Sequence, residues 1–243
     1  MKIAAVIPAR FNSTRFPGKP LALISGRPMI WWVHTQVKKV GRFDDVFVAT
    51  DDDRIKNYCE ENNIKVVMTS DQHPNHIFRI HEISELLNFD YYVCINGDEP
   101  MIEPQIIESI LEPIKNGEKI FALNLMTAIK EPTQAIDFAK IKIVTDENGY
   151  GIYMSRSPVP YPRGSSLYKF KKYVGVECFT KEALDFYVGS PMSTLEKIED
   201  IDHLRFIENG KKIKFIEVES ETLSVDTPKD LDKVIDLICG KED

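Results

Sequence analysis

The amino-terminal stretch from Lys2 to Pro20 constrains the fold of this chain more than any other segment. Its first residues, Ile3 to Ile7, are apolar one after another, which is typical of a strand buried on both faces. Three prolines and Gly18 follow, and they exclude a helix and predict a stiffened, turn-rich loop. The loop therefore leaves the carboxyl end of a strand, where ligands bind in open parallel sheets.

Arg10, Arg15 and Lys19 crowd this loop and would repel one another unless an anion lay between them. Arginine and lysine together suit phosphate oxygens, so the loop predicts a polyphosphate site. The alternative is a solvated surface loop, which the stiffening by proline and glycine disfavours. The chain has neither a G-x-G-x-x-G nor a G-x-x-x-x-G-K-[ST] motif, which argues against a dinucleotide dehydrogenase and a P-loop phosphotransferase.

The length of the chain limits its domain organisation, and its net charge limits its binding partners. The 243 residues suffice for one large α/β domain with a smaller lobe, and the formal net charge of −7 disfavours nucleic acid and anionic membranes as partners. No apolar window has membrane-spanning length and the chain starts directly into a strand, so we expect a cytoplasmic protein. The scattered cysteines, with no C-x-x-C, indicate neither a disulfide framework nor a zinc site.

Strands and helices alternate in the first half, which predicts right-handed parallel crossovers and an α/β sheet that binds a nucleotide. The rhythm breaks after residue 120, so we expect a nucleotide-binding half at 1–119, a β-rich lobe at 120–190 and a return to the main sheet at 191–243. The predicted helices are 28–39, 52–62, 80–87, 106–114, 180–187, 194–209 and one that starts near 226. The predicted strands are 3–7, 46–50, 65–69, 91–96, 120–128, 139–144, 150–155, 174–179 and 214–218, with a hairpin turn at Asn148-Gly149.

Acidic residues at the end of the 91–96 strand complement the cationic loop. Asp98 follows Gly97 at the same sheet edge, where a carboxylate would hold Mg²⁺ that bridges phosphate oxygens. A helix-capping role, the alternative, explains Glu103 better than Asp98. Capping is also the main interpretation for Asp52, and Asp226 is the expected N-cap ahead of Pro228.

The run from Ile7 to Leu21, IPARFNSTRFPGKPL, closely resembles the opening signature of the cytidylyltransferases that make CMP-Kdo, Kdo being 3-deoxy-manno-octulosonate. The resemblance implies a Rossmann-like nucleotidyltransferase fold, transfer of CMP from CTP to a sugar acid with release of pyrophosphate, and a homodimer serving lipopolysaccharide or capsule synthesis. Further signature positions are Ala49–Asp52, Met68–Ser70, His73, Gly97–Pro100, Ser155–Arg156, Pro158, Pro160–Arg163, Leu195–Glu196, Ile198–Glu199, Leu204–Arg205 and Val225–Pro228.

The resemblance also implies which residues form the site. Asp98 and Asp226 would hold Mg²⁺, and together with Arg10 and Lys19 they would neutralise charge on the leaving group while the acceptor hydroxyl is aligned. The implied nucleotide-binding residues are Ala9, Arg10, Arg15, Lys19, Ser70, His73, Arg79 and Asp98. The candidate acceptor-binding residues are Asn96, Arg156, Tyr161, Tyr173, Glu177, Asp202 and His203.

Departures from the family pattern fall mostly on the acceptor side. The family's Ser-Gly-Thr-Asp-Arg run is replaced by residues 75–79, which keep only Arg79, and its Glu-Gln pair before Leu-Arg is replaced by 202–203. This chain has Asn96 where the family has a glutamine, and Tyr173 and Glu177 where the family has a histidine and a tyrosine. Because a buried carboxylate needs a partner, we expect Kdo to be a poor substrate and the acceptor to carry a different polar group, such as a cationic amine, beside Glu177.

Three functions remain open from the sequence. The first is a Mg²⁺-dependent cytidylyltransferase that acts on a sugar acid such as Kdo. The second keeps CTP but uses another acid, an amino-sugar acid or a phosphonate. The third is a catalytically inactive regulator that binds the nucleotide, and the presence of both Asp98 and Asp226 argues against it.

Overall fold

The computed structural model describes residues 1–12, 15–165, 167–221 and 223–240. The chain divides into two compact units, the first formed by residues 1–108 with 221–243 and the second by residues 109–220. These boundaries differ from the ones expected near residues 119 and 190. Among the helices of the described residues, none is long and apolar enough to span a bilayer.

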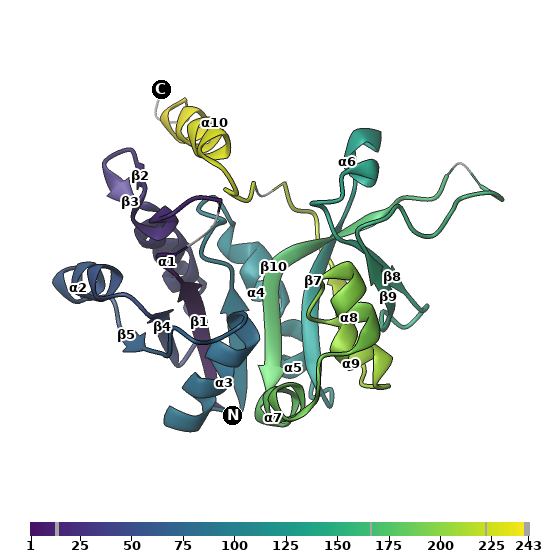
Figure 1. Ribbon diagram of the computed structural model, residues 1–243, viewed down its shortest axis with the longest axis horizontal. Coiled ribbons are helices and arrows are strands. Elements are labelled where there is room, and N and C mark those ends of the chain that lie inside the picture. The colour runs from purple at the N-terminus through teal and green to yellow at the C-terminus, as the bar shows by residue number, and fades with distance from the viewer. Residues whose placement is uncertain (13–14, 166, 222, 241–243) are drawn as a thin grey trace. The chain divides into compact units, whose positions relative to one another are not determined.

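The first unit is built on four parallel strands in the order β6-β1-β4-β5, as the alternation of strands and helices predicted. Figure 1 shows these strands with their connecting helices. The strands are β1 (Ile3–Ala9), β4 (Asp45–Thr50), β5 (Val66–Met68) and β6 (Tyr91–Ile95). The other elements are a 3-10 turn at Lys19–Leu21, the hairpin β2 (Leu23–Ile24) and β3 (Arg27–Pro28), α1 (Met29–Val40), α2 (Asp53–Glu61), α3 (His76–Leu86), α4 (Pro104–Ser109) and α10 (Pro228–Cys239).

The first strand is longer than predicted, because it runs through Pro8 to Ala9. Its register with β4 continues to the end, whereas its register with β6 stops at Val6. A residue without an N–H is tolerated at the end of a strand where the ladder on one side has already finished. The cationic loop therefore starts at Arg10.

The structure confirms one expected helix cap and corrects one helix start. Asp52 caps α2, as expected, because its carboxylate accepts a hydrogen bond from the Arg54 N–H at 2.9 Å. Helix α3 begins at His76, four residues earlier than expected, because the Asn75 side chain caps it by accepting from the N–H groups of residues 77 and 78. An asparagine cap was the signal that the sequence reasoning passed over.

The cap of the last helix is also one residue away from the prediction. Thr227, not Asp226, is the N-cap of α10, and it forms a capping box with Asp230 while Pro228 lies in the first turn. Threonine takes this role because its short hydroxyl reaches the exposed N–H groups of the first turn. The Asp226 carboxylate is therefore left to interact elsewhere.

The C-terminal segment folds back onto the first unit. Val225 and Val234 form a buried cluster with Ile24 of β2 and Met29 of α1. Figure 1 shows α10, in yellow, near the β2–β3 hairpin. Burial of these apolar side chains fixes the segment that carries Asp226.

The second unit pairs β7 antiparallel with β10 and parallel with β11, and its β8–β9 hairpin joins β10 through β8. The predicted turn at Asn148-Gly149 is confirmed, with Gly149 at φ 83, and so is the Thr180 cap of α7. The strands are β7 (Ala122–Ala128), β8 (Lys142–Thr145), β9 (Gly151–Ser155), β10 (Lys171–Thr180) and β11 (Ile213–Glu217). The helices are α5 (Glu112–Lys115), α6 (Pro132–Ile136), α7 (Lys181–Gly189), α8 (Thr194–Glu199) and α9 (Leu204–Glu208).

Two predicted helices are each split in the structure. The 106–114 helix breaks before Pro113, which cannot continue a helix because it lacks an N–H, and restarts as α5. The 194–209 helix breaks at Asp200, whose backbone is left-handed at φ 53, between α8 and α9. The apolar periodicity runs across both breaks, which is why the sequence predicted single helices.

A buried ion pair joins the helices of the second unit. The Arg205 guanidinium donates twice to the Glu196 carboxylate, each bond at 2.7 Å, and once to the carbonyl of Tyr187 at 2.8 Å. The Tyr187 hydroxyl donates to Glu196 at 2.9 Å. These contacts give two of the family's signature positions, Glu196 and Arg205, a structural role in holding α7, α8 and α9 together.

The first unit should show a pH-dependent stability that comes from α1. Burial, reinforced by the nearby Lys38 charge, lowers the pKa of His34 from 6.5 to about 4. Between pH 6.5 and 4 the unfolded chain binds a proton that the folded chain excludes, so stability present above pH 6.5 is lost as the pH falls. We expect the free energy of unfolding, measured in urea, to fall by roughly 1–2 kcal/mol less in His34→Gln than in the wild type over this pH range. Equal losses in the two proteins would contradict the assignment.

Candidate functional site

A polar pocket of about 260 Å³ lies in the first unit where strand ends meet. Four cationic side chains and a single carboxylate line it, so it attracts an anion of several charges. The pocket forms where the sequence predicted a polyphosphate site, at the carboxyl ends of β1 and β6. Its lining residues are Pro8, Ala9, Arg10, Arg15, Lys19, Pro20, His76, Arg79, Asn96, Gly97 and Asp98.

The loop that carries the cations is closed by Phe11. Gly18 adopts a left-handed φ of 73, its N–H donates to the Phe11 carbonyl at 2.8 Å, and a Cβ at this position would lie 3.1 Å from the Phe11 ring. The Arg54 guanidinium lies over the Phe11 ring, 3.2 Å from its centroid, and Asp52 holds this guanidinium by two side-chain hydrogen bonds of 2.9 and 2.7 Å. We call Phe11, Gly18, Asp52 and Arg54 the Phe11 latch. It fixes the loop between its own turn and α2.

The two predicted metal ligands lie on neighbouring segments. The Val225 N–H donates to the Asp98 carbonyl at 2.8 Å, which brings Asp226 to the end of β6. Each carboxylate is paired with a cation of the loop: the Lys19 ammonium lies 2.6 Å from Asp98 Oδ2, and the Arg15 guanidinium lies 2.9 Å from Asp226 Oδ1. The Lys19 ammonium also donates to the Val225 carbonyl at 2.9 Å.

The Asp98 carboxylate has one oxygen to spare. Its Oδ1 atom is buried and has no hydrogen-bond partner among the described residues. A buried acceptor of this kind is costly unless a ligand satisfies it, and a carboxylate oxygen is what a hard divalent cation prefers. The residues present therefore fit a magnesium ion.

The segment after β5 is tied down by Glu82, a residue that the sequence analysis did not single out. The Glu82 carboxylate accepts from the Ser70 N–H at 2.9 Å and lies 2.5 Å from His73 Nε2. Burial alone would raise the pKa of Glu82, but the hydrogen bonds from His73 and Ser70 outweigh it and lower the pKa below its ordinary value. The signal in the sequence is spacing, since Glu82 follows Arg79 by one helical turn on α3.

Arg79 is only 1% exposed, and its charge is met inside the first unit. Its guanidinium donates to Asp51 at 2.7 Å and to the Thr69 hydroxyl. The pair joins the end of β4, the end of β5 and α3, and it leaves the Arg79 side chain at the pocket wall. A buried arginine held by a carboxylate keeps its orientation when a ligand arrives.

His76 is a pocket residue that the sequence analysis did not single out. The structure places it at the first position of α3, on the pocket wall with Arg79. The Asn75 cap, read correctly, would have extended the helix to this residue.

In the second unit, Arg156 binds main-chain groups. Its guanidinium donates to the carbonyls of Glu199 at 2.6 Å and Asp200 at 2.8 Å, and its N–H donates to the Glu199 carboxylate at 2.9 Å. The buried Lys142 ammonium donates to the Arg156 carbonyl. These contacts cap the end of α8, and binding of an acceptor carboxylate by Arg156 stays a prediction.

Tyr173, Glu177 and His203 form a buried cluster. An irregularity in β10 between Val174 and Glu177 lets the Tyr173 hydroxyl donate to the Glu177 carboxylate, and His203 Nε2 lies 3.8 Å from the second oxygen. Glu177 therefore has polar partners within its own unit. This removes the physical basis for expecting a cationic acceptor group beside Glu177 and Kdo as a poor substrate.

The remaining acceptor candidates are dispersed. Asn96 lines the pocket of the first unit, whereas Asp202 accepts a hydrogen bond from Tyr187 at 3.2 Å in the second. Tyr161 is 83% exposed and belongs to a different cavity. The role of each in acceptor binding stays a prediction.

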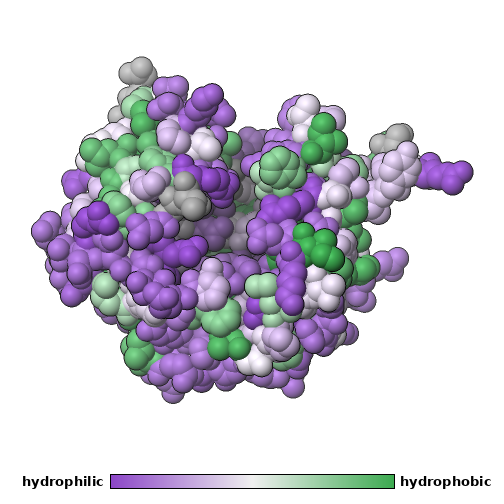
Figure 2. Space-filling view, in the orientation of Figure 1, coloured by the Kyte–Doolittle hydropathy of each residue, from purple (hydrophilic) through white to green (hydrophobic). Residues whose placement is uncertain are grey.

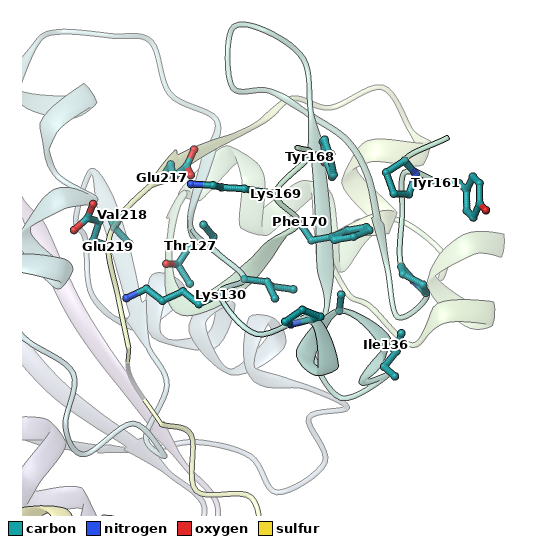
Figure 3. A pocket seen from close by; sticks show the side chains of 16 residues that line it. Thr127, Lys130, Ile136, Tyr161, Tyr168, Lys169, Phe170, Glu217, Val218 and Glu219 are labelled. Atoms are coloured by element: carbon teal, nitrogen blue, oxygen red, sulfur yellow. The ribbon is translucent and has the colours of Figure 1, made fainter. Parts of the chain in front are cut away.

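That second cavity, of about 990 Å³, lies wholly in the second unit, between α6, the ends of β7 and β11, and the extended segment at 158–165 and 167–170. Figure 3 shows the Phe170 side chain between Tyr168 and Ile136, with Lys169 beside Glu217 at another part of the wall. In Figure 2 green hydrophobic side chains stand among white and purple ones over this part of the molecule. The lining of the cavity includes the apolar residues Ile129, Ala135, Ile136, Phe170 and Val218, whereas charged residues dominate the pocket of the first unit.

A parallel α/β sheet whose strand ends carry a cationic loop and facing carboxylates defines a nucleotidyltransferase. The chain belongs to the cytidylyltransferase family, whose sequence model matches residues 4–213. Among its relatives is the 3-deoxy-manno-octulosonate cytidylyltransferase of Fusobacterium nucleatum, 37% identical, with 98% of this chain and 97% of the relative covered. The enzyme of the same name from Thermodesulfovibrio yellowstonii is 38% identical, with 96% of each chain covered.

Solved structures agree on the fold. A CMP:2-keto-3-deoxy-manno-octonic acid synthetase in complex with CTP matches with a TM-score of 0.94 and 34% identity, over 99% of this chain and all of the other. A 4-diphosphocytidyl-2C-methyl-D-erythritol synthase from Anaerococcus prevotii, only 15% identical, has a TM-score of 0.66, with 98% of each chain covered. The second likeness concerns the fold alone, and it shows that this fold tolerates wide sequence change.

The Phe11 latch should control nucleotide affinity. Phe11→Ala removes the ring that contacts both Gly18 and Arg54, so the loop cations lose their fixed positions. We expect the KM for CTP to rise about tenfold with the fold intact. Arg54→Ala should act in the same direction but more weakly. Arg42→Ala, which removes an exposed ion pair with Glu108, is the matched control and should change nothing. An unchanged KM in Phe11→Ala would refute the role of the latch.

Proposed function

We propose that this protein transfers CMP from CTP to 3-deoxy-manno-octulosonate and releases pyrophosphate. The observation that carries the proposal is a pocket lined by Arg10, Arg15, Lys19 and Asp98, in which one buried oxygen of the Asp98 carboxylate has no hydrogen-bond partner among the described residues. Such a pocket suits a triphosphate with a divalent cation, and the curated relatives carry the name of this activity.

The cations of the loop stabilise the pyrophosphate leaving group. As the acceptor hydroxyl attacks the α-phosphorus, negative charge grows on the departing pyrophosphate, and Arg10, Arg15 and Lys19 neutralise it from fixed positions. Asp98 and Asp226 would hold Mg²⁺, which when bound adds positive charge at the phosphate oxygens. The reaction is a direct displacement, so no covalent bond between enzyme and substrate is required.

The nucleoside end of CTP belongs to the segment after β5 in this proposal. Ser70 and His73 are held by Glu82, and Arg79 is held by Asp51, so these three candidate contacts are positioned before the ligand binds. Fixed donors require no rearrangement when the nucleotide arrives, which favours binding. CTP is a cytosolic metabolite, so we place the enzyme in the cytoplasm.

The acceptor should be recognised through the remaining candidates, Asn96 among them. Arg156 and the Tyr173–Glu177–His203 cluster are organised by contacts within the second unit, and we propose that they shape the acceptor side of the reaction. Transfer to another sugar acid, an amino-sugar acid or a phosphonate is the competing proposal. It draws on the sequence departures at Asn96 and Tyr173.

Pyrophosphate release with CTP, Mg²⁺ and a panel of acids tests the function. We expect 3-deoxy-manno-octulosonate to be the best acceptor, and Asp98→Asn and Asp226→Asn to lower kcat at least about a hundredfold with the fold retained, because one carboxylate holds the ion weakly. Asp230→Asn, which alters the cap of α10 and an exposed contact with Lys233, is the matched control. Faster turnover of an amino-bearing acid or a phosphonate would favour the competing acceptor, and no turnover of any acid would favour a regulator.

A homodimer is the proposed assembly. Exposed apolar side chains gather on the second unit around α6 and the extended segment, and such a group is typical of an interaction surface. These side chains are Ile136, Phe138, Tyr161, Leu167 and Tyr168.

Sedimentation measurements test this assembly. We expect a dimer for the wild type and a shift to monomer in Ile136→Glu with Phe138→Glu, because charges on an apolar contact cost desolvation energy. Ile198→Glu, which changes an exposed apolar residue of α8, is the matched control and should remain dimeric. A monomeric wild type at micromolar concentration would contradict the proposal.

A further inference from the structure

In the first unit, the carboxylates proposed to hold the metal are already paired with the cations proposed to hold the triphosphate. Lys19 Nζ lies 2.6 Å from Asp98 Oδ2, and Arg15 lies 2.9 Å from Asp226 Oδ1. In each pair, a carboxylate proposed to bind the metal is joined to a side-chain cation proposed to bind the triphosphate. The site cannot bind either ligand fully without separating these pairs.

We propose that the two ion pairs exchange partners on binding, so that the divalent cation and the nucleotide bind cooperatively and each binds weakly alone. In the exchange, Lys19 and Arg15 move from the carboxylates to phosphate oxygens, and Asp98 and Asp226 move from the side-chain cations to the metal. This inference rests on the proposed function and adds that the affinity for each ligand depends on the presence of the other.

The electrostatics of the Lys19–Asp98 pair support the exchange. Its side chains are only 15% and 22% exposed, so solvent screens their charges less than on an open surface. An ammonium 2.6 Å from the carboxylate repels an incoming divalent cation and occupies one ligand atom. In the same way, Asp98 reduces the attraction of Lys19 for phosphate. When both ligands arrive together, every charge finds an opposite partner.

The geometry also gives the Asp98 carboxylate a reason to exchange. Asp98 Oδ1 is buried and lacks a hydrogen-bond partner among the described residues, while Oδ2 holds Lys19. Opening of the Lys19 pair would expose the carboxylate, and a metal ion would then give both oxygens a partner. Lys19 keeps a hydrogen bond to the Val225 carbonyl at 2.9 Å, which holds its ammonium near the site during the exchange.

The two pairs should contribute unequally. Arg15 and Asp226 are 66% and 33% exposed, so water screens their attraction and the pair separates at little cost. Lys19 is therefore the residue whose removal should reveal the coupling most clearly. Arg10 offers a matched control, because it lines the same pocket but makes no ion pair with a carboxylate in the described part of the chain.

The test measures Mn²⁺ binding to the purified full chain by electron paramagnetic resonance, with and without CTP and without acceptor. Binding of Mn²⁺ to CTP in solution is measured separately and subtracted. For the wild type we expect CTP to tighten Mn²⁺ binding fivefold or more, the lower end of typical couplings. For Lys19→Ala and Lys19→Met we expect Mn²⁺ alone to bind about fivefold tighter than to the wild type, and CTP to bind more weakly.

The controls separate this inference from the proposed function. Arg10→Ala should weaken CTP binding and leave the affinity for Mn²⁺ alone unchanged, and Asp98→Asn should abolish tight Mn²⁺ binding in both states. Mn²⁺ binding that stays the same or weakens in both Lys19 variants, with CTP-dependent binding intact in the wild type, would overturn the exchange alone. A wild type that binds no Mn²⁺ even with CTP would overturn the metal site and the exchange together.

Discussion

The backbone hydrogen bond from Val225 to Asp98 is the contact on which the site depends. It joins the end of β6 to the segment before α10. Lys19 strengthens the junction because its ammonium binds both the Asp98 carboxylate and the carbonyl of Val225, a residue 206 positions away from Lys19 in the chain. The next residue, Asp226, is thereby brought to the cationic loop. The apolar cluster under α10 holds this segment in place, so burial far from the site decides where a charged group stands.

Charged residues around the pocket are held mainly by other charged or polar residues of the first unit. Glu82 fixes the segment of Ser70 and His73, Asp51 fixes Arg79, and Asp52 fixes Arg54 against Phe11. Side chains oriented in advance stabilise developing charge without reorganising, which is the main contribution that a protein makes to phosphoryl transfer. The Lys19–Asp98 pair belongs to this scheme, but its members can trade partners.

Several signature residues of the family hold parts of the second unit together. Glu196 and Arg205 form a fully hydrogen-bonded pair between helices, and Glu199 binds the main chain and side chain around Arg156. Buried polar groups of this kind need all their partners, because an unsatisfied charge in an apolar interior is destabilising. A sequence motif alone does not distinguish the two roles, since both demand the same residue types.

The sequence by itself determined the parallel α/β order of the first unit, the loop cations at the end of β1 and Asp98 at the end of β6. Apolar runs and the prolines or glycines that end them are local patterns of a few residues. They therefore predict strands and loops without knowledge of tertiary contacts. Only the tertiary structure decided which polar groups meet. It made Thr227 the cap and freed Asp226 for Arg15, because both a threonine and an aspartate can cap a helix and only the packing of α10 selects between them.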